Sequence, residues 1–128
     1  TTLAGVMWQT NTKIYAYVGM KKYMEQQENV RKLLTWGGLL EEDISLKERQ
    51  VTWLSTSEYG TFGNLTESAQ EAIKDWSTII DVPLDGIYNG KMWLKLVELL
   101  KQKHFSEGSK ILFLHTGGLQ GNEGVGLS

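Results

Sequence analysis

The residues best suited to bind a ligand follow a short apolar run late in the sequence. His115, Thr116, Gly117 and Gly118 come directly after residues 110–114, whose apolar and aromatic side chains predict a buried strand. A hydroxyl and two glycines at the carboxyl end of such a strand lie where open α/β sheets bind ligands, and glycine lets a flat or anionic ligand approach the backbone. A plain strand-to-turn connection explains the same residues equally well.

A second stretch of the sequence indicates which ligand these residues could bind. Residues 83–92 read Pro-Leu-Asp-Gly-Ile-Tyr-Asn-Gly-Lys-Met, and residues 111–121 read Ile-Leu-Phe-Leu-His-Thr-Gly-Gly-Leu-Gln-Gly. In this order and at this separation, the two stretches resemble the C-terminal half of the 1-aminocyclopropane-1-carboxylate deaminase and D-cysteine desulfhydrase family, which belongs to the tryptophan synthase β-like group of pyridoxal-phosphate enzymes. The family usually has Leu-Asp-Pro-Val-Tyr-Thr-Gly-Lys in the first stretch. The sequence matches this pattern at Leu84, Asp85, Tyr88, Gly90 and Lys91.

The resemblance implies a cofactor, pyridoxal 5'-phosphate, and roles for particular residues. Thr116 would lie beside the pyridine nitrogen of the cofactor, with Gly117 and Gly118 in the same wall of the pocket. A neutral hydroxyl there would make the cofactor ring a weaker electron acceptor, because it does not enforce a charged pyridinium as an aspartate would. Tyr88 would offer its phenol to the substrate, a small amino acid, as a proton carrier or nucleophile. The other interpretation of Tyr88 is a loop tyrosine that caps the core.

The opening of the sequence resembles the end of the family's phosphate-binding loop. Thr1 and Thr2 would sit at a helix N-terminus, whose free N–H groups suit a phosphate. The family's Schiff-base lysine comes from a segment well upstream of that loop, and neither Lys91 nor Lys110 is a good substitute for it. We therefore expect residues 1–128 to be the C-terminal part of a larger cofactor-binding domain. A missing N-terminal segment or a second copy would complete it, and the chain alone would be inactive.

Three departures from the family pattern leave a second hypothesis open. Residues 58–64 resemble a family stretch that commonly reads Glu-Tyr-His-Phe-Gly-Gly-Tyr, but the final tyrosine is replaced by Asn64 or Leu65, depending on the alignment. An amide cannot replace a phenol as an acid or base. Gly86 and Asn89 also depart from the pattern. The expected function is removal of ammonia or sulfide from a small amino acid, and the alternative is a non-catalytic, truncated or degenerate relative with a structural or interaction role.

The elements that must position these residues can be read from the apolar periodicity. Residues 13–18, 50–55 and 110–114 predict strands, and residues 2–10, 22–35, 67–80 and 90–102 predict helices. Either Thr66 or Ser68 could cap the third of these helices. Alternating strands and helices predict an α/β fold with a parallel sheet flanked by helices. Since three strands are few for such a sheet, we expect an incomplete part of a tryptophan synthase β-like fold.

Composition excludes several classes of protein. The 128 residues suit one domain, and 13 basic against 15 acidic residues, with no basic cluster, argue against a nucleic-acid surface. No apolar run is long enough to span a membrane, and the sequence has no cysteine and no signal peptide, which favours a cytoplasmic setting. His104 and His115 are far apart without other ligands at metal-binding spacing, so no metal site is predicted.

Overall fold

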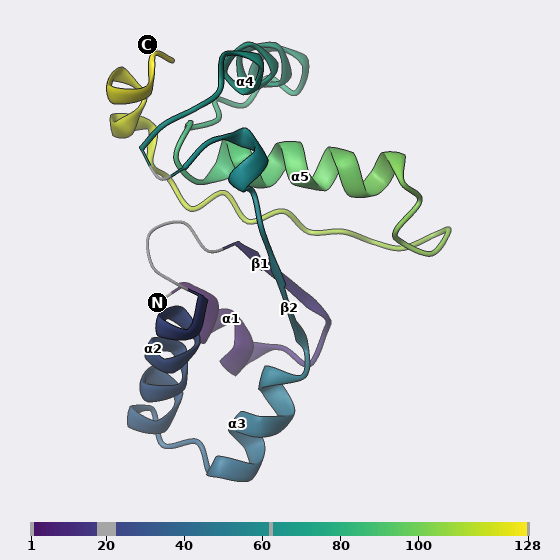
Figure 1. Cartoon of the computed structure of the whole chain (residues 1–128). Coiled ribbons are helices and arrows are strands. Elements are labelled where there is room, and N and C mark those ends of the chain that lie inside the picture. The colour runs from purple at the N-terminus through teal and green to yellow at the C-terminus, as the bar shows by residue number, and fades with distance from the viewer. Residues whose placement is uncertain (1, 18–22, 62, 128) are drawn as a thin grey trace. The chain divides into compact units, whose positions relative to one another are not determined.

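The structure is a computed structural model that describes residues 2–17, 23–61 and 63–127. The chain divides into two compact units, Thr1–Ser55 and Thr56–Ser128 (Figure 1). Each unit has a hydrophobic cluster of its own. No described helix has both the length and the apolar character that crossing a membrane requires.

The first unit has a small parallel sheet and three helices. Its elements are α1 (Thr2–Gln9), β1 (Ile14–Tyr17), α2 (Tyr23–Trp36), α3 (Glu41–Glu48) and β2 (Val51–Leu54). The two strands pair in parallel, with Ile14 opposite Val51 and Tyr17 opposite Leu54. The helices between them supply the crossover that a parallel pair needs. The predicted strands at 13–18 and 50–55 and the predicted helices at 2–10 and 22–35 are therefore confirmed where they fall on described residues.

The helix α3 was not expected from the sequence. Only Ile44 in this helix is fully buried, so the sequence lacks the repeated apolar positions that identify an amphipathic helix. Acidic residues fill its first turn and Lys47 lies in its last turn, an arrangement that suits the helix dipole. Arg31 of α2 also forms ion pairs with Glu41 and with Glu48, at the two ends of α3. Tertiary contacts and helix-end charges stabilise this helix.

The second unit is built on two helices, α4 (Glu67–Ile79) and α5 (Asn89–Lys101), together with three short 3-10 helices, η1 (Ser57–Tyr59), η2 (Leu119–Gly121) and η3 (Glu123–Val125). Thr66 caps α4 by accepting a 3.2 Å hydrogen bond from the backbone N–H of Ala69, which decides between the two caps considered. Ala69, Ile73, Leu84 and Leu94 form the buried cluster between the helices. Both predicted helices are confirmed within a residue or two.

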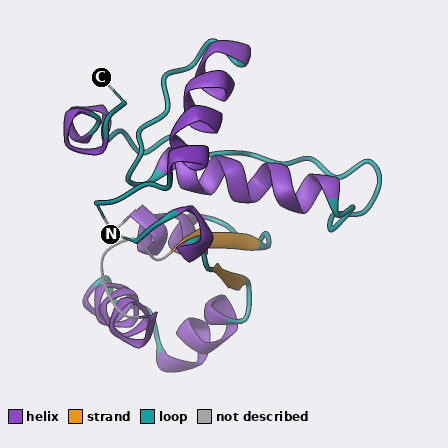
Figure 2. Ribbon diagram, turned by 45° about the horizontal axis from the view of Figure 1, so that its top comes forward, coloured by secondary structure: helices purple, strands orange, loops and turns teal. Residues whose placement is uncertain are grey.

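The predicted third strand at residues 110–114 is wrong. This segment forms an extended connection that runs beside α5, and Figure 2 shows strand structure only in β1 and β2 among the described residues. Phe113 packs edge-on against Trp93 of α5, with ring centroids 5.3 Å apart, while Ile111, Leu112 and Leu114 are exposed. A strand needs a neighbouring strand for its backbone hydrogen bonds, and the described part of this unit contains none. The chain is α/β, and its described residues contain two strands in place of the three predicted.

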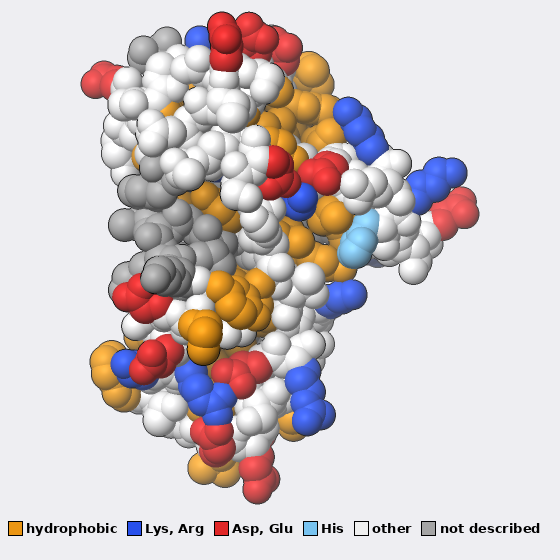
Figure 3. Space-filling model, in the orientation of Figure 1, with side chains coloured by type: hydrophobic (Ala, Val, Ile, Leu, Met, Phe, Trp, Pro, Cys, Tyr) orange, Lys and Arg blue, Asp and Glu red, His pale blue; other side chains and the backbone are white. Residues whose placement is uncertain are grey.

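Charged side chains are mixed over the face of the molecule drawn in Figure 3, where blue and red groups alternate. The near balance of basic and acidic residues in the sequence agrees with this distribution.

Candidate active site

A buried aspartate builds the turn that leads into α5. Asp85 is fully buried, and its carboxylate accepts hydrogen bonds from three successive backbone N–H groups. These belong to Ile87 at 3.0 Å, Tyr88 at 2.6 Å and Asn89 at 2.9 Å. The carboxylate thus satisfies N–H groups at the start of the helix that have no partner within it, where a negative charge is also favoured by the helix dipole. The backbone of Tyr88 is thereby fixed at the start of α5.

Asn89 joins this turn to residues 116–118, which belong to the second stretch that resembles the family. Asn89 is buried, and its side-chain N–H₂ group donates to the carboxylate of Asp85 and to the carbonyl of Gly117, both at 2.5 Å. Its side-chain oxygen accepts from the backbone N–H of Thr116 at 3.0 Å and from the Thr116 hydroxyl at 3.5 Å. Residues 85–89 and 116–118, which the sequence singled out separately, therefore meet at one amide. We define these two segments as the candidate site.

Gly118 is required by this arrangement. Its φ of +109° lies in the region that favours glycine, and a Cβ built there would lie 3.0 Å from the carboxyl carbon of Asp85. Gly117 has a φ of +85°, but a Cβ there would meet no described atom within 4 Å. Packing therefore explains why position 118 is glycine. At position 117 the backbone borders open space, as contact with a flat ligand requires.

The imidazole of His115 also links Gly117 to the turn before α5. Its Nδ1 atom accepts from the backbone N–H of Gly117 at 3.2 Å, and its Nε2 atom lies 2.9 Å from the carbonyl oxygen of Pro83. A carbonyl only accepts, so these two contacts together assign the proton to Nε2. The neutral tautomer of His115 thus ties residue 117 to the turn before α5.

Other residues of the first motif also have structural roles. Leu84 belongs to the core between α4 and α5. Gly90 packs so closely that a Cβ would lie 2.5 Å from the carbonyl oxygen of Asp85. At Gly86, which departs from the family pattern, a Cβ would meet the side chains of Leu65 and Val125 at 2.6 Å. The departure at Gly86 is therefore explained by close packing in this chain.

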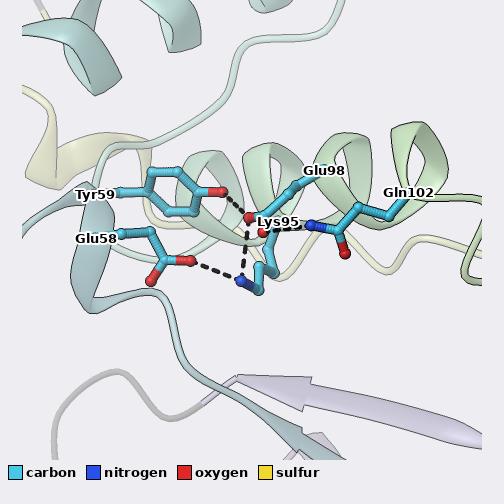
Figure 4. Close-up of polar contacts among 5 residues, drawn as sticks. All are labelled: Glu58, Tyr59, Lys95, Glu98 and Gln102. Carbon is cyan, nitrogen blue, oxygen red and sulfur yellow. Dashed lines mark hydrogen bonds and ion pairs between the residues drawn. The ribbon is translucent and has the colours of Figure 1, made fainter.

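The segment 58–64 is held to α5 by a polar cluster that the sequence did not reveal (Figure 4). Tyr59 donates its hydroxyl to Glu98 at 2.8 Å, and Lys95 pairs with Glu58 at 2.7 Å and with Glu98 at 3.1 Å. Burial, the hydrogen bond to Glu98 and the nearby carboxylates raise the pKa of the Tyr59 phenol far above its ordinary value. Tyr59 is therefore a fixed hydrogen-bond donor and not an acid or base near neutral pH.

The pKa values of two members of this cluster, Glu98 and Lys95, are shifted in the direction that favours their ionised forms. Hydrogen bonds from Tyr59 and Lys95 lower the pKa of the Glu98 carboxyl. The hydrogen bond to Glu58 raises the pKa of the Lys95 ammonium, with Glu98 adding to the shift and burial opposing it. The cluster is an ion-pair network that fixes η1 on α5.

The structure also shows where the remaining predicted site residues and Lys91 lie. Thr2 opens α1 in the first unit, and Thr1 lies outside the described residues. Within the candidate site, Thr116 is exposed and its hydroxyl donates to the side-chain oxygen of Asn89 at 3.5 Å, so the hydroxyl oxygen is left to accept a hydrogen bond, and the O–H group can donate to another atom only by leaving Asn89. Lys91 is fully buried, and its ammonium is bound to three backbone carbonyls, so it is unavailable to a cofactor. The described residues of the candidate site therefore provide a hydroxyl and accessible backbone and contain no lysine.

Residues 85–89 and 116–118 are thus joined through the side chain of Asn89. Comparison with curated proteins shows which proteins the chain resembles. The chain is 29% identical over 80 residues to a 1-aminocyclopropane-1-carboxylate deaminase of Rhizobium rhizogenes, a match that covers 62% of this chain and 24% of the relative. It is 32% identical over 68 residues to a deaminase of the same name from Allorhizobium ampelinum, covering 53% of this chain and 20% of the relative.

A third relative has a different activity in its name. The chain is 37% identical over 57 residues to a D-cysteine desulfhydrase of Salmonella newport, a match that covers 44% of this chain and 17% of the relative. The matches therefore span about a quarter or less of the length of these relatives. No family model and no solved structure matches the chain. The similarity to deaminases and desulfhydrases is local and covers about half of this chain.

Proposed function

We propose that this chain is part of a pyridoxal-phosphate enzyme that removes ammonia or sulfide from a small amino acid, as the names of its relatives suggest. The observation that carries the proposal is the Asn89 bridge, which holds Thr116 at 3.0 Å and so brings the proposed ring contact to the turn that bears Tyr88. Two segments that resemble the same enzyme family at separate places in the sequence thus share one site.

The bound cofactor would supply an electron sink for negative charge at a carbon of the substrate. In our proposal the Thr116 hydroxyl binds the ring nitrogen, and the exposed backbone at Gly117 borders the ring. Asn89 orients this segment, since its amide engages Thr116 and Gly117 at the same time. A neutral hydroxyl at the ring nitrogen would leave the ring less electron-withdrawing than a carboxylate would.

Tyr88 is the residue we propose to act on the substrate. The carboxylate of Asp85 holds its backbone N–H at 2.6 Å, and the side chain is half-buried at the start of α5. Leu84, Asp85 and Gly90 of the same motif have structural roles, and Tyr88 is the residue of this motif to which the family resemblance gives a role at the substrate. A phenol placed there can give a proton to the substrate or take one from it.

The other parts of such a site would come from elsewhere. We propose, from the family resemblance alone, that Thr1 and Thr2 contact the cofactor phosphate; of the two, the structure describes Thr2, which opens α1. The lysine that attaches the cofactor would come from a preceding segment, because Lys91 is engaged in the core. The catalytic unit would then be a longer protein, either alone or as a homo-oligomer.

The experiment uses the full-length protein and pyridoxal phosphate. We expect cofactor absorbance in the visible range with induced circular dichroism, and release of ammonia or sulfide from 1-aminocyclopropane-1-carboxylate or D-cysteine. Thr116→Val should shift the absorbance maximum and weaken binding, whereas Thr116→Ser should preserve both. The matched control is Thr78→Val, which removes an exposed hydroxyl bonded within α4. A full-length protein that binds no cofactor would refute the proposal and favour the non-catalytic alternative.

A further inference from the structure

Lys91 is the third residue of α5 and is fully buried. Its ammonium donates to the carbonyl oxygens of Gly60 at 2.8 Å, Thr61 at 2.7 Å and Asn64 at 2.9 Å. Lysine is among the residues least often buried in proteins, and those that are buried are normally paired with an acid. Here the partners are three carbonyls of a single loop.

The number of acceptors requires the charged form. A protonated lysine has three N–H donors, one for each carbonyl, whereas the neutral amine has two. Burial lowers the pKa of this lysine, and its place in the first turn of α5 is unfavourable for a cation. No carboxylate among the described residues lies within ion-pair distance of its ammonium. The three carbonyl dipoles are therefore the groups that hold the charge.

The same face of α5 holds the rest of the segment. Lys95 and Glu98, which follow Lys91 by four and seven residues, bind Glu58 and Tyr59. At the other end, Leu65 reaches back to the turn before α5, where its side chain would lie 2.6 Å from a Cβ at Gly86. The loop thus begins at the ion-pair cluster, is bound by Lys91 in its middle, and ends against the turn of the candidate site.

We propose that Lys91 is a positioning residue that acts as a tethered monovalent cation, and that the carbonyls of Gly60, Thr61 and Asn64 form its binding cradle. Without the lysine, the same cradle should take a small cation such as ammonium or potassium. The cradle fixes residues 64 and 65 beside the turn of Asp85. Any role of the cradle in catalysis rests on the proposed function, whereas the binding of Lys91 by the three carbonyls does not depend on that function.

Two variants separate the charge of Lys91 from its volume. Lys91→Met keeps most of the volume and leaves three carbonyls without donors, and Lys91→Ala also opens space. Both should lower the Tm by roughly 5–10 °C. Ammonium chloride should restore at least half of this loss in Lys91→Ala with a saturable dependence on concentration. It should not restore Lys91→Met, where the side chain fills the space.

Two controls make this rescue specific. Tetramethylammonium chloride at the same ionic strength should give no rescue, because the ion is too large for the cradle. Lys32→Ala, which removes an exposed lysine paired with Glu28, should not respond to ammonium. A Lys91→Met variant as stable as the unmodified protein would overturn the proposal. Equal rescue by both salts would do so as well.

Local readouts test the position of the loop itself. The N–H of Asn64 donates to the Thr61 carbonyl, and the N–H of Thr66 donates to the Tyr59 carbonyl. Hydrogen exchange at these two amides should accelerate at least tenfold in Lys91→Ala and slow again when ammonium is added. Exchange that stays unchanged at both amides would contradict a positioning role.

The unmodified protein provides a test that does not depend on a variant that folds. The ¹⁵N resonance of the Lys91 side chain should show a protonated NH₃⁺ group, protected from solvent and coupled to the three carbonyl carbons. A neutral amine or an unprotected ammonium would overturn the proposal. None of these measurements uses pyridoxal phosphate, so their outcome is independent of whether the chain binds that cofactor.

Discussion

The side-chain oxygen of Asn89 accepts a 3.0 Å hydrogen bond from the backbone N–H of Thr116, and the same amide donates to the buried carboxylate of Asp85. The buried carboxylate at the start of α5 and the proposed ring contact, Thr116, are thus linked through one side chain, that of Asn89. A substitution of Asn89 should therefore affect both the turn at Asp85 and the position of Thr116.

Replacing Asn89 tests this link. Asn89→Ala removes the donors to Asp85 and Gly117 together, and we expect it to lower the free energy of unfolding by about 1–3 kcal/mol. Asn89→Asp should be worse, because it places a second carboxylate against the buried carboxylate of Asp85. Urea unfolding measures both effects, and hydrogen exchange at Thr116 should accelerate. The exposed Asn11→Ala serves as the control, and equal stability of all three variants would contradict the link.

The two glycines of the site should respond differently to alanine. Gly118→Ala combines an unfavourable positive φ with a Cβ close to the carboxyl of Asp85, and we expect a loss of about 2–4 kcal/mol. Gly117→Ala meets open space and should lose only about 1 kcal/mol from its backbone conformation. Thermal unfolding compares the pair directly. The reverse order of stability would show that the Asp85 carboxylate does not constrain position 118.

Two tyrosine variants separate chemistry from stability. In the full-length protein, Tyr88→Phe should lower kcat by about 10²-fold to 10⁴-fold, because the phenol is proposed to carry a proton. Tyr59→Phe should lower the Tm and leave kcat nearly unchanged, since it removes the hydrogen bond to Glu98. Steady-state kinetics and thermal unfolding provide the two readouts. Normal turnover in Tyr88→Phe would assign that residue to the structure alone.

The pH dependence of stability should report on Glu98. Its pKa is lower in the folded protein than its ordinary value of 4.5, so the stabilisation is present above pH 4.5 and is lost as the pH falls through the folded value. Glu98→Gln should therefore reduce the urea midpoint at neutral pH, and the difference from the unmodified protein should close in acid. In the exposed pair with Lys32, Glu28→Gln should cause little change at either pH. A difference for Glu98→Gln that persists in acid would rule out the ion pair as its cause.

Periodicity was sufficient for the elements that bury a regular apolar stripe. The helices α4 and α5 follow from local patterns because their own side chains determine which face is inside, whereas β1 and β2 follow from short apolar runs and are half-buried along their whole length. The same reasoning missed α3, where a single buried isoleucine and long-range ion pairs replace a stripe. It also predicted a strand at 110–114, since an apolar β-prone run looks the same with or without a neighbouring strand.

The candidate site was predictable only in part. Sequence reasoning selected Tyr88, Thr116 and the two glycines through resemblance to a family, and the structure brings residues 85–89 and 116–118 together. It treated Asn89 as a departure from the pattern, whereas the structure makes it the joint between the segments. A buried side chain that bonds to residues 27 and 28 positions later leaves no periodic signal. The burial of Lys91 was equally hidden, because lysine normally lies at the surface.

The extended run at residues 110–114 has a consequence for the behaviour of the chain at high concentration. Leu112 is 83% exposed, and Ile111 and Leu114 are 44% and 48% exposed, along a backbone outside any described sheet. Short apolar runs of this kind, without proline and with free backbone groups, are the segments through which chains associate into intermolecular β-structure. The shelf life and the usable concentration of the purified chain should therefore depend on these residues more than on the stability of either core.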